Sequence, residues 1–335
     1  MTPLRVGLVG LGMMGRHHAR VLRALDGVEL VAVADATGDV HQAAPGVPLH
    51  PDVEGLIAHG IDAAVCAVPT GLHEQVGLRL AEAGVHTLFE KPVAAGVDEG
   101  RRLRTAFEQA GLVGAVGHIE RFNPAVQELK RQLAAGEIGR VVQIATRRQG
   151  PFPGRIADVG VVKDLGTHDI DLTAWLGGSP YAWVAGHTAR ATGRSHEDLM
   201  AATGALADKT AVNHVVNWLS PFKERIVVVT GEGGTLVADT VATDLTLHEN
   251  GVVKTEWDAI AISRGVSEGR VIRLAFPKAE PLRIELEAFV RAVNGDATGI
   301  VGLGEGVATL AVAEAVLRSA ETRRVVEIAT EGTGA

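Results

Sequence analysis

The sequence predicts an α/β protein of two domains, a doubly wound parallel sheet followed by a domain built on a mainly antiparallel sheet. Three observations support this prediction. The 335 residues are enough for about two domains of roughly 150 residues each. The first third of the chain alternates short β-branched runs with helical patterns, which is typical of parallel strands joined by crossover helices. After about Gly117 the apolar runs lengthen, and several are joined by tight polar turns.

The predicted strands of the first part are near-continuous apolar runs. Strands of this kind are buried on both faces, as in a parallel sheet that has helices on either side. A helix is expected over residues 15–25, where Ala19, Leu22 and Leu25 recur at helical spacing. The expected strands are residues 5–9, 30–34, 63–68, 87–89 and 113–116.

The second part begins with a helix predicted over residues 122–135 and ends with helices predicted over residues 281–294 and 303–322. Between them, Ala207-Asp208-Lys209 resembles a hairpin turn, and strands joined by hairpins form an antiparallel sheet that is open on one face. The expected strands are residues 141–148, 200–207, 210–218, 225–230 and 245–248. The two predicted domains are residues 1–118 and 119–335.

Composition argues against several classes of protein. The net charge is -8 and no block rich in lysine and arginine occurs, so nucleic acid is not an expected partner. No apolar stretch reaches the roughly 18 residues of a membrane span, so membrane insertion is not expected. The single cysteine, Cys66, lies in an apolar run and is expected to be buried in the core of a cytoplasmic protein.

The motif Gly10-Leu11-Gly12-Met13-Met14-Gly15 follows the first predicted strand and opens the first predicted helix. A dinucleotide-binding turn requires this context, because the pattern alone carries little information in a chain with 41 glycines. Gly10 permits the tight turn, Gly12 lets the backbone approach a pyrophosphate, and Gly15 lets helix and strand pack closely. The free N–H groups of the helix, with Met13 and Met14 beside them, would face the phosphates.

Asp35 closes the second predicted strand, 20 residues after Gly15. A carboxylate at this position accepts hydrogen bonds from the ribose hydroxyls of adenosine and repels a 2′-phosphate. The sequence therefore predicts NAD rather than NADP as the cofactor. The alternative is a glycine-rich turn that an acidic residue follows by chance.

Two further segments follow predicted strands at their carboxyl ends, where doubly wound sheets bind their ligands. They are Pro69-Thr70-Gly71-Leu72-His73 and Glu90-Lys91-Pro92. The proline stiffens the chain after Lys91 and raises the odds of a cis peptide bond. Lys91 is a candidate to bind a hydroxyl group and remove its proton, and the alternative is a solvated surface lysine.

Asp164 and His168 form a second candidate pair, because residues four apart on a helix share one face. A carboxylate beside an imidazole holds the ring and raises its pKa, which suits a base near neutral pH. The alternative is a first helical turn whose acids complement the helix dipole. A metal site is less well supported, because His168 with Asp164 or Asp171 gives too few ligands and no cysteine completes a zinc set.

Over essentially its whole length, the sequence resembles the Gfo/Idh/MocA family of oxidoreductases. The matching landmarks are Gly10-x-Gly12-x-x-Gly15, Pro69-Thr70 with His73, Glu90-Lys91-Pro92 and Asp164-x-x-x-His168. The resemblance implies an N-terminal Rossmann domain and a C-terminal α/β domain with a large open, mainly antiparallel sheet. It implies that Pro69, Thr70, His73 and Glu90 bind the cofactor together with the glycine motif. It also implies that Lys91 and His168 flank the reacting hydroxyl with Asp164 beside them, and that open sheets pair into homodimers or homotetramers. Which of Lys91 and His168 accepts the proton stays open.

Within the family, residues 118–124, 147–155 and 158–171 are most similar to UDP-N-acetylglucosamine 3-dehydrogenases. That similarity implies oxidation at C3 of a nucleotide sugar. Independently, Arg147, Arg148 and Arg155 offer planar forks suited to a diphosphate, and surface ion pairs are the alternative role for these arginines. Other members act on inositols or free sugars with the same catalytic core, which is the alternative for the substrate. An NAD-dependent glycosidase and a non-catalytic NAD-binding sensor are the remaining alternatives.

Overall fold

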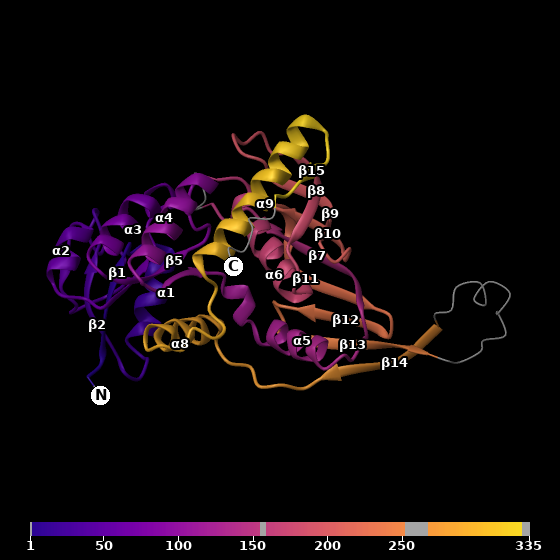
Figure 1. Cartoon of the computed structure of the whole chain (residues 1–335), viewed down its shortest axis with the longest axis horizontal. Helices are drawn as coiled ribbons and strands as arrows, with labels where there is room; N and C mark the ends of the chain where they lie inside the picture. Colours follow the sequence, from indigo (N-terminus) through magenta and orange to yellow (C-terminus); the bar gives the residue numbers. More distant parts are fainter. Residues whose placement is uncertain (1, 155–158, 252–266, 330–335) are drawn as a thin grey trace. The chain divides into compact units, whose positions relative to one another are not determined.

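A computed structural model describes residues 2–154, 159–251 and 267–329 (Figure 1). The contacts divide the chain into two compact units. The first comprises Met1–Phe122 and Glu280–Ala311, and the second comprises Asn123–Ala279 and Val312–Ala335. This division differs from the predicted domains chiefly because residues 280–311 return to the first unit.

The first unit is built on a six-stranded parallel sheet with strand order β3-β2-β1-β4-β5-β6, the order of a Rossmann fold. Alternate strand residues are buried in different apolar clusters, so both faces of the sheet are covered, as the near-continuous apolar runs predict. Cys66 is buried in β4, and burial raises the pKa of its thiol to about 12. The strands are β1 (Leu4–Val9), β2 (Val28–Ala34), β3 (Leu49–His50), β4 (Ala63–Cys66), β5 (His86–Glu90) and β6 (Gly114–Gly117). The helices are α1 (Met13–Leu22), α2 (Val53–Ala58), η1 (Thr70–Leu72), α3 (His73–Glu82), α4 (Val97–Gln109) and η2 (Ile119–Phe122).

Helix α8 (Pro281–Val293) explains why a late segment of the chain belongs to the first unit. Leu282, Leu286 and Phe289 lie on one face of this helix and are buried in the same apolar cluster as Leu22 of α1. Apolar periodicity predicts such a helix, but it does not reveal which sheet the apolar face covers. Helix α9 (Leu303–Thr322) follows, and its residues are divided between the two units.

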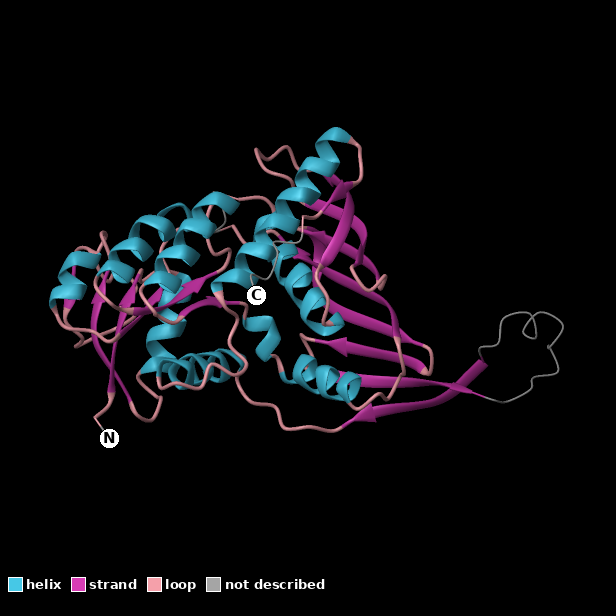
Figure 2. Ribbon diagram, in the orientation of Figure 1, coloured by secondary structure: helices cyan, strands magenta, loops and turns pink. Residues whose placement is uncertain are grey.

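The second unit is built on a nine-stranded sheet with strand order β14-β13-β12-β11-β7-β10-β9-β8-β15. The described strands pair antiparallel except β7 and β10, which are parallel, so the prediction of a mainly antiparallel sheet is confirmed. Helices α5 and α6 lie against one face of the sheet (Figure 2). The strands are β7 (Val141–Pro151), β8 (Tyr181–Ala189), β9 (Leu199–Leu206), β10 (Ala211–Asn217), β11 (Leu219–Gly231), β12 (Gly234–Asp239), β13 (Asp244–Gly251), β14 (Ser267–Leu274) and β15 (Val326–Glu327). The helices are α5 (Pro124–Ala134), η3 (Val162–Gly166) and α6 (Thr167–Gly177).

The alternation of side chains along β7 decides which residues face the helices. Ile144 is buried in one cluster with Leu172 and Leu176 of α6. Because successive strand residues point to opposite faces, Arg148 lies on the helix-covered face and Arg147 on the other face.

Across the described residues, no helix combines the length and apolar character that a membrane span needs.

Candidate active site

The turn between β1 and α1 has the geometry that its three glycines predict. Gly10 has a φ of 92°, and a Cβ atom there would lie 2.5 Å from the carbonyl oxygen of Ala67. A Cβ atom on Gly15 would lie 2.0 Å from the carbonyl oxygen of Gly10, so only glycine lets α1 pack on the turn. A Cβ atom on Gly12 would meet nothing within 4 Å. The backbone at the start of α1 is therefore open to a ligand, and this fits the pyrophosphate of a dinucleotide.

Strands β1 and β4 are neighbours at the point where the strand order reverses, which is where doubly wound sheets bind their ligands. The glycine turn follows β1, and Pro69 and Thr70 follow β4. Met13 and Pro69 are exposed, whereas Met14 and Thr70 are half-buried. All four predicted residues therefore lie at this edge and remain accessible to a cofactor.

Asp35 directly follows β2 and is tied to the glycine turn. Its Oδ2 accepts a hydrogen bond from the backbone N–H of Leu11 at 2.7 Å. Its Oδ1 accepts from the backbone N–H of Thr37 at 2.8 Å and from the Thr37 hydroxyl at 2.7 Å. Burial opposes ionisation, but these hydrogen bonds outweigh it and hold the pKa of Asp35 below its usual value. The carboxylate is therefore negatively charged and fixed beside the turn.

His73, which is expected to contact the cofactor, is completely buried. Its Nδ1 lies 3.2 Å from the carbonyl oxygen of Val93, and its Nε2 lies 3.0 Å from the carbonyl oxygen of Val68. Val68 belongs to the loop after β4 and Val93 to the loop after β5. The ring therefore joins the two loops that carry Thr70 and Lys91.

Glu90 ends β5, and its carboxylate is engaged by a residue that sequence reasoning missed. His18, buried on α1, places Nε2 2.8 Å from Glu90 Oε1, and the backbone N–H of Lys91 donates to Glu90 Oε2 at 3.2 Å. Burial opposes ionisation, but the bond to His18 and the nearby charge of Lys91 hold the pKa of Glu90 below its usual value. The Lys91-Pro92 peptide is cis, as the sequence predicts. The lysine backbone is thus held through the side chain of the preceding residue.

Asp164 and His168 lie on one continuous helical segment, but its first turn is wider than an α-helix. Residues Val162–Gly166 form a π-helix, and α6 continues from Thr167. Both side chains are buried, with exposed fractions of 4% for Asp164 and 7% for His168. Single π turns recur at functional sites, and no feature of the sequence indicated this one.

Glu197 caps this helical segment and is a second residue that sequence reasoning missed. Its Oε1 accepts a hydrogen bond from the backbone N–H of Val162 at 3.1 Å, and its backbone carbonyl accepts from Val161 at 2.9 Å. A Cβ atom on Gly160 would lie 1.9 Å from Glu197 Oε1. A carboxylate at a helix N-terminus also complements the helix dipole. Glu197 therefore fixes where the helix that carries Asp164 begins.

Two of the three arginines predicted to bind a diphosphate, Arg147 and Arg148, lie on opposite faces of the sheet. Arg147 lies on the face of the sheet opposite α6 and pairs with Glu224. Arg148 is 2% exposed, and its Nε donates to Asp169 Oδ1 at 2.8 Å. Arg155 lies outside the described residues. Neighbouring arginines on a strand point to opposite faces, which is why they cannot form one phosphate clamp.

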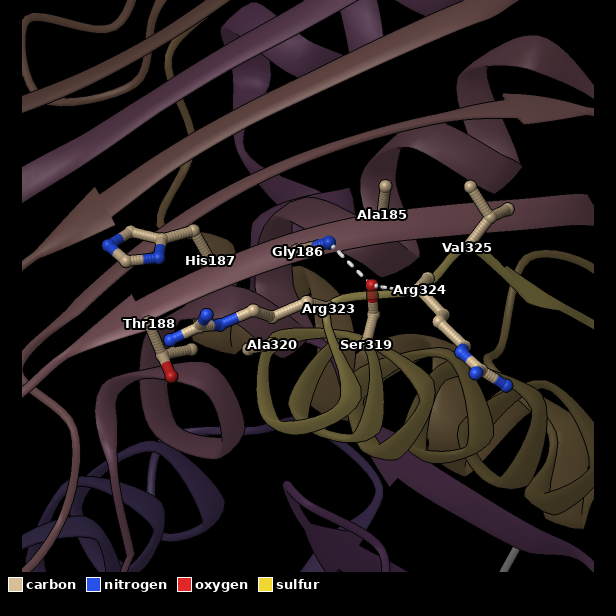
Figure 3. A pocket seen from close by; sticks show the side chains of 9 residues that line it. All are labelled: Ala185, Gly186, His187, Thr188, Ser319, Ala320, Arg323, Arg324 and Val325. Atoms are coloured by element: carbon tan, nitrogen blue, oxygen red, sulfur yellow. Dashed lines mark hydrogen bonds between the residues drawn. The ribbon is translucent and has the colours of Figure 1, made fainter.

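A cavity of about 450 Å³ lies in the second unit, between β8 and the end of α9 (Figure 3). Its lining includes His187, Arg323 and Arg324, and the buried Ser319 accepts a hydrogen bond there from the backbone N–H of Gly186. None of the predicted site residues lines this cavity.

In the described parts of the chain, no cluster of three or more potential metal ligands is present.

Family models match both parts of the chain. Residues 4–118 match the NAD-binding Rossmann fold of an oxidoreductase family. Residues 130–328 match the C-terminal alpha/beta domain of the same family.

Three relatives illustrate the similarity. The chain is 31% identical over 334 residues to inositol 2-dehydrogenase 2 of Saccharopolyspora erythraea. The aligned region covers 95% of this chain and 94% of that protein. It is 35% identical over 183 residues to UDP-N-acetylglucosamine 3-dehydrogenase of Acidithiobacillus ferrooxidans. This aligned region covers 53% of this chain and 56% of that protein. A solved structure of UDP-N-acetylglucosamine 3-dehydrogenase from Acidithiobacillus ferrooxidans superposes with a TM-score of 0.82 at 26% identity and covers 96% of this chain and 99% of that one.

Proposed function

Since the chain belongs to the Gfo/Idh/MocA family of oxidoreductases, and is therefore an NAD(P)-dependent dehydrogenase that acts on hydroxyl groups, we propose that it oxidises a secondary ring hydroxyl of an inositol or a free sugar with NAD. The observation that carries this proposal is the similarity to an inositol 2-dehydrogenase over nearly the whole of both chains. The positions of Arg147 and Arg148 agree with it, because the two lie on opposite faces of the sheet and the guanidinium of Arg148 is buried against Asp169, so the pair does not form a diphosphate clamp. A substrate without a nucleotide needs no such clamp.

The first unit supports NAD as the cofactor. Gly12 leaves the start of α1 open, and the ionised Asp35 beside it favours ribose hydroxyls over a 2′-phosphate. When bound, NAD supplies the acceptor for the hydride. Lys91 and His168 bind and orient the hydroxyl and take up its proton, and Asp164 supports the imidazole. Either Lys91 or His168 serves as the proton acceptor in this scheme.

A nucleotide sugar is the second candidate substrate. It is favoured by the 35% identity to UDP-N-acetylglucosamine 3-dehydrogenase over about half of the chain, and by the 26% identity to the solved structure of that name. The motifs of the sequence favour this substrate, whereas the similarity over nearly the whole of an inositol 2-dehydrogenase favours the first candidate.

Reduction of NAD, followed by absorbance, tests the proposal. The purified protein is mixed with NAD or NADP and with myo-inositol, scyllo-inositol, free hexoses or UDP-N-acetylglucosamine. We expect reduction of NAD with at least one cyclic polyol or free sugar, and none in a Lys91→Ala variant that still binds NADH. Reduction with UDP-N-acetylglucosamine alone would replace the first substrate class by the second. Release of a leaving group from a glycoside without net reduction would support an NAD-dependent glycosidase instead.

A further inference from the structure

A chain of buried polar side chains crosses the helix-covered face of the nine-stranded sheet. Its members are Tyr181 at the start of β8, His214 on β10, Thr146 and Arg148 on β7, and Asp169 on α6. Each of the five is at most 5% exposed. Asp169 is the residue next to His168 in the first turn of α6.

In this series of hydrogen bonds, the carboxylate of Asp169 can only accept, and this sets the direction of the other bonds. Thr146 Oγ1 donates its only proton to Asp169 Oδ2 at 3.1 Å, so it can only accept from His214 Nδ1 at 2.8 Å. The imidazole of His214 therefore carries its proton on Nδ1. In a neutral ring Nε2 is then an acceptor, and it accepts from the Tyr181 hydroxyl at 2.8 Å. Burial lowers the pKa of His214 to about 4, so the ring is neutral at ordinary pH.

Asp169 thus accepts hydrogen bonds from Arg148 and Thr146, and His214 and Tyr181 are linked to it through Thr146. Arg148 Nε donates to its Oδ1 at 2.8 Å, and Thr146 donates to its Oδ2. Burying such a charged pair costs desolvation energy, and apolar residues of the same volume often stabilise a protein as well or better. Stability alone therefore does not account for this arrangement.

The first two turns of helix α6 have no exposed face that would set the rotation of the helix about its own axis. All seven residues Thr167–Thr173 are buried, so no single apolar face of this turn is distinguished from a solvent face. The two oxygens of Asp169 are held by side chains of β7, and these bonds tie the first turn of the helix to that strand. His168, the preceding residue, is carried with it.

We propose that Arg148, Thr146, His214 and Tyr181 form a positioning network that fixes α6 through Asp169 and so aims His168 at the reacting hydroxyl. They are positioning residues, since none is required to touch substrate or cofactor. The catalytic part of this inference rests on the proposed function, whereas the effect on the His168 ring is a property of the protein alone.

Thr146 is the best position for a test, because its hydroxyl is the link between His214 and Asp169. Thr146→Val keeps the shape of the side chain and removes the hydroxyl, whereas Thr146→Ser restores it. The matched control is Thr246→Val on β13, a half-buried strand threonine outside the network. The first readout is nitrogen NMR of the imidazole rings, with His168 and His214 assigned through His→Gln variants.

In the wild type, we expect His214 to be protonated on Nδ1. Thr146→Val should alter the His214 tautomer and shift the His168 ring signals, whereas Thr146→Ser and Thr246→Val should leave both unchanged. With a substrate from the panel above, Thr146→Val should lower kcat by about tenfold or more, with unchanged binding of NADH, and Thr146→Ser should recover most of it.

Unchanged His168 signals in a folded Thr146→Val variant would overturn the proposal, and so would equal losses in the Val and Ser variants. If no substrate reacts even with the wild type, the proposed function fails, and the NMR result alone then decides the role of the network. A native NMR signature in Thr146→Val together with a loss of activity would also refute the proposal. Tyr181, the only tyrosine of the chain, gives an independent signature. Because burial raises its pKa, its absorbance should titrate only after the second unit unfolds.

Discussion

Replacing Arg148 with methionine is expected to destabilise the second unit by about 3–5 kcal/mol. The side chains of Arg148 and Asp169 are 2% and 1% exposed, and their closest atoms are 2.8 Å apart. The substitution leaves a buried carboxylate without its cation. The remaining bond from Thr146 contributes only about 1 kcal/mol and does not compensate. A loss of this size is a large part of the roughly 5–15 kcal/mol by which domains are stable.

Tryptophan fluorescence during urea unfolding measures this loss in the right part of the chain. All four tryptophans fall within residues 175–257, which belong to the second unit, so the signal is not mixed with unfolding of the first. With a urea dependence of about 1–3 kcal/mol per molar, the midpoint should fall by about 1 M or more.

Two further variants decide the cause. The neighbouring Arg147→Met is the matched control, because Arg147 is exposed and its ion pair with Glu224 contributes at most about 1 kcal/mol. A double variant with Arg148→Met and Asp169→Leu removes both buried charges and should recover most of the stability. A loss of stability in Arg148→Met no larger than that in Arg147→Met would contradict this prediction, and so would a double variant no more stable than Arg148→Met alone.

Three further predictions concern the cofactor site and acid stability. Gly12→Ala should fold with an unchanged unfolding midpoint, because the added Cβ atom meets nothing within 4 Å. It should nevertheless weaken NADH binding in a fluorescence titration, and unchanged binding would contradict the role of the turn. Asp35→Ser should move the ratio of kcat/KM values towards NADP, and an unaltered ratio would show that Asp35 does not select the cofactor. The pKa of His214, lowered by burial from 6.5 to about 4, means that only the unfolded chain takes up this proton between those pH values. Stability from the neutral ring, about 3 kcal/mol, is therefore complete above pH 6.5 and is lost as the pH falls towards 4. The midpoint difference between wild type and His214→Asn should shrink over that range, and a constant difference would argue against the neutral ring.

The sequence predicts the fold class because its signals are local. The glycine motif, the apolar runs at residues 63–68 and 87–89, and the hairpin at Ala207-Asp208-Lys209 each depend on neighbouring residues, and each is present in the structure. Helix α1 begins at Met13 rather than at residue 15, and five strands, β3, β8, β12, β14 and β15, are absent from the predicted strands. Strand β12 contains only six residues between two tight turns, so it gives a weak apolar pattern.

The site is harder to predict, because the partners of its side chains are distant in sequence. His18 and Glu90 are 72 residues apart, and Arg148 and Asp169 are 21 apart. No local pattern marks either pair. One signal was present: on a strand with Ile144 facing the core, Arg148 shares its face and Arg147 does not. That alternation, applied to the sequence, separates the two arginines and argues against a diphosphate clamp that uses both of them.

The most direct test of the central claim is the kcat of a Lys91→Met/His168→Gln double variant beside the two single variants, with the best substrate and saturating NAD. If both side chains act on one hydroxyl, each single substitution lowers kcat by about a hundredfold or more, and the double variant is little worse than the poorer single one. Independent losses that multiply in the double variant, or a single variant that keeps wild-type kcat, would contradict the account.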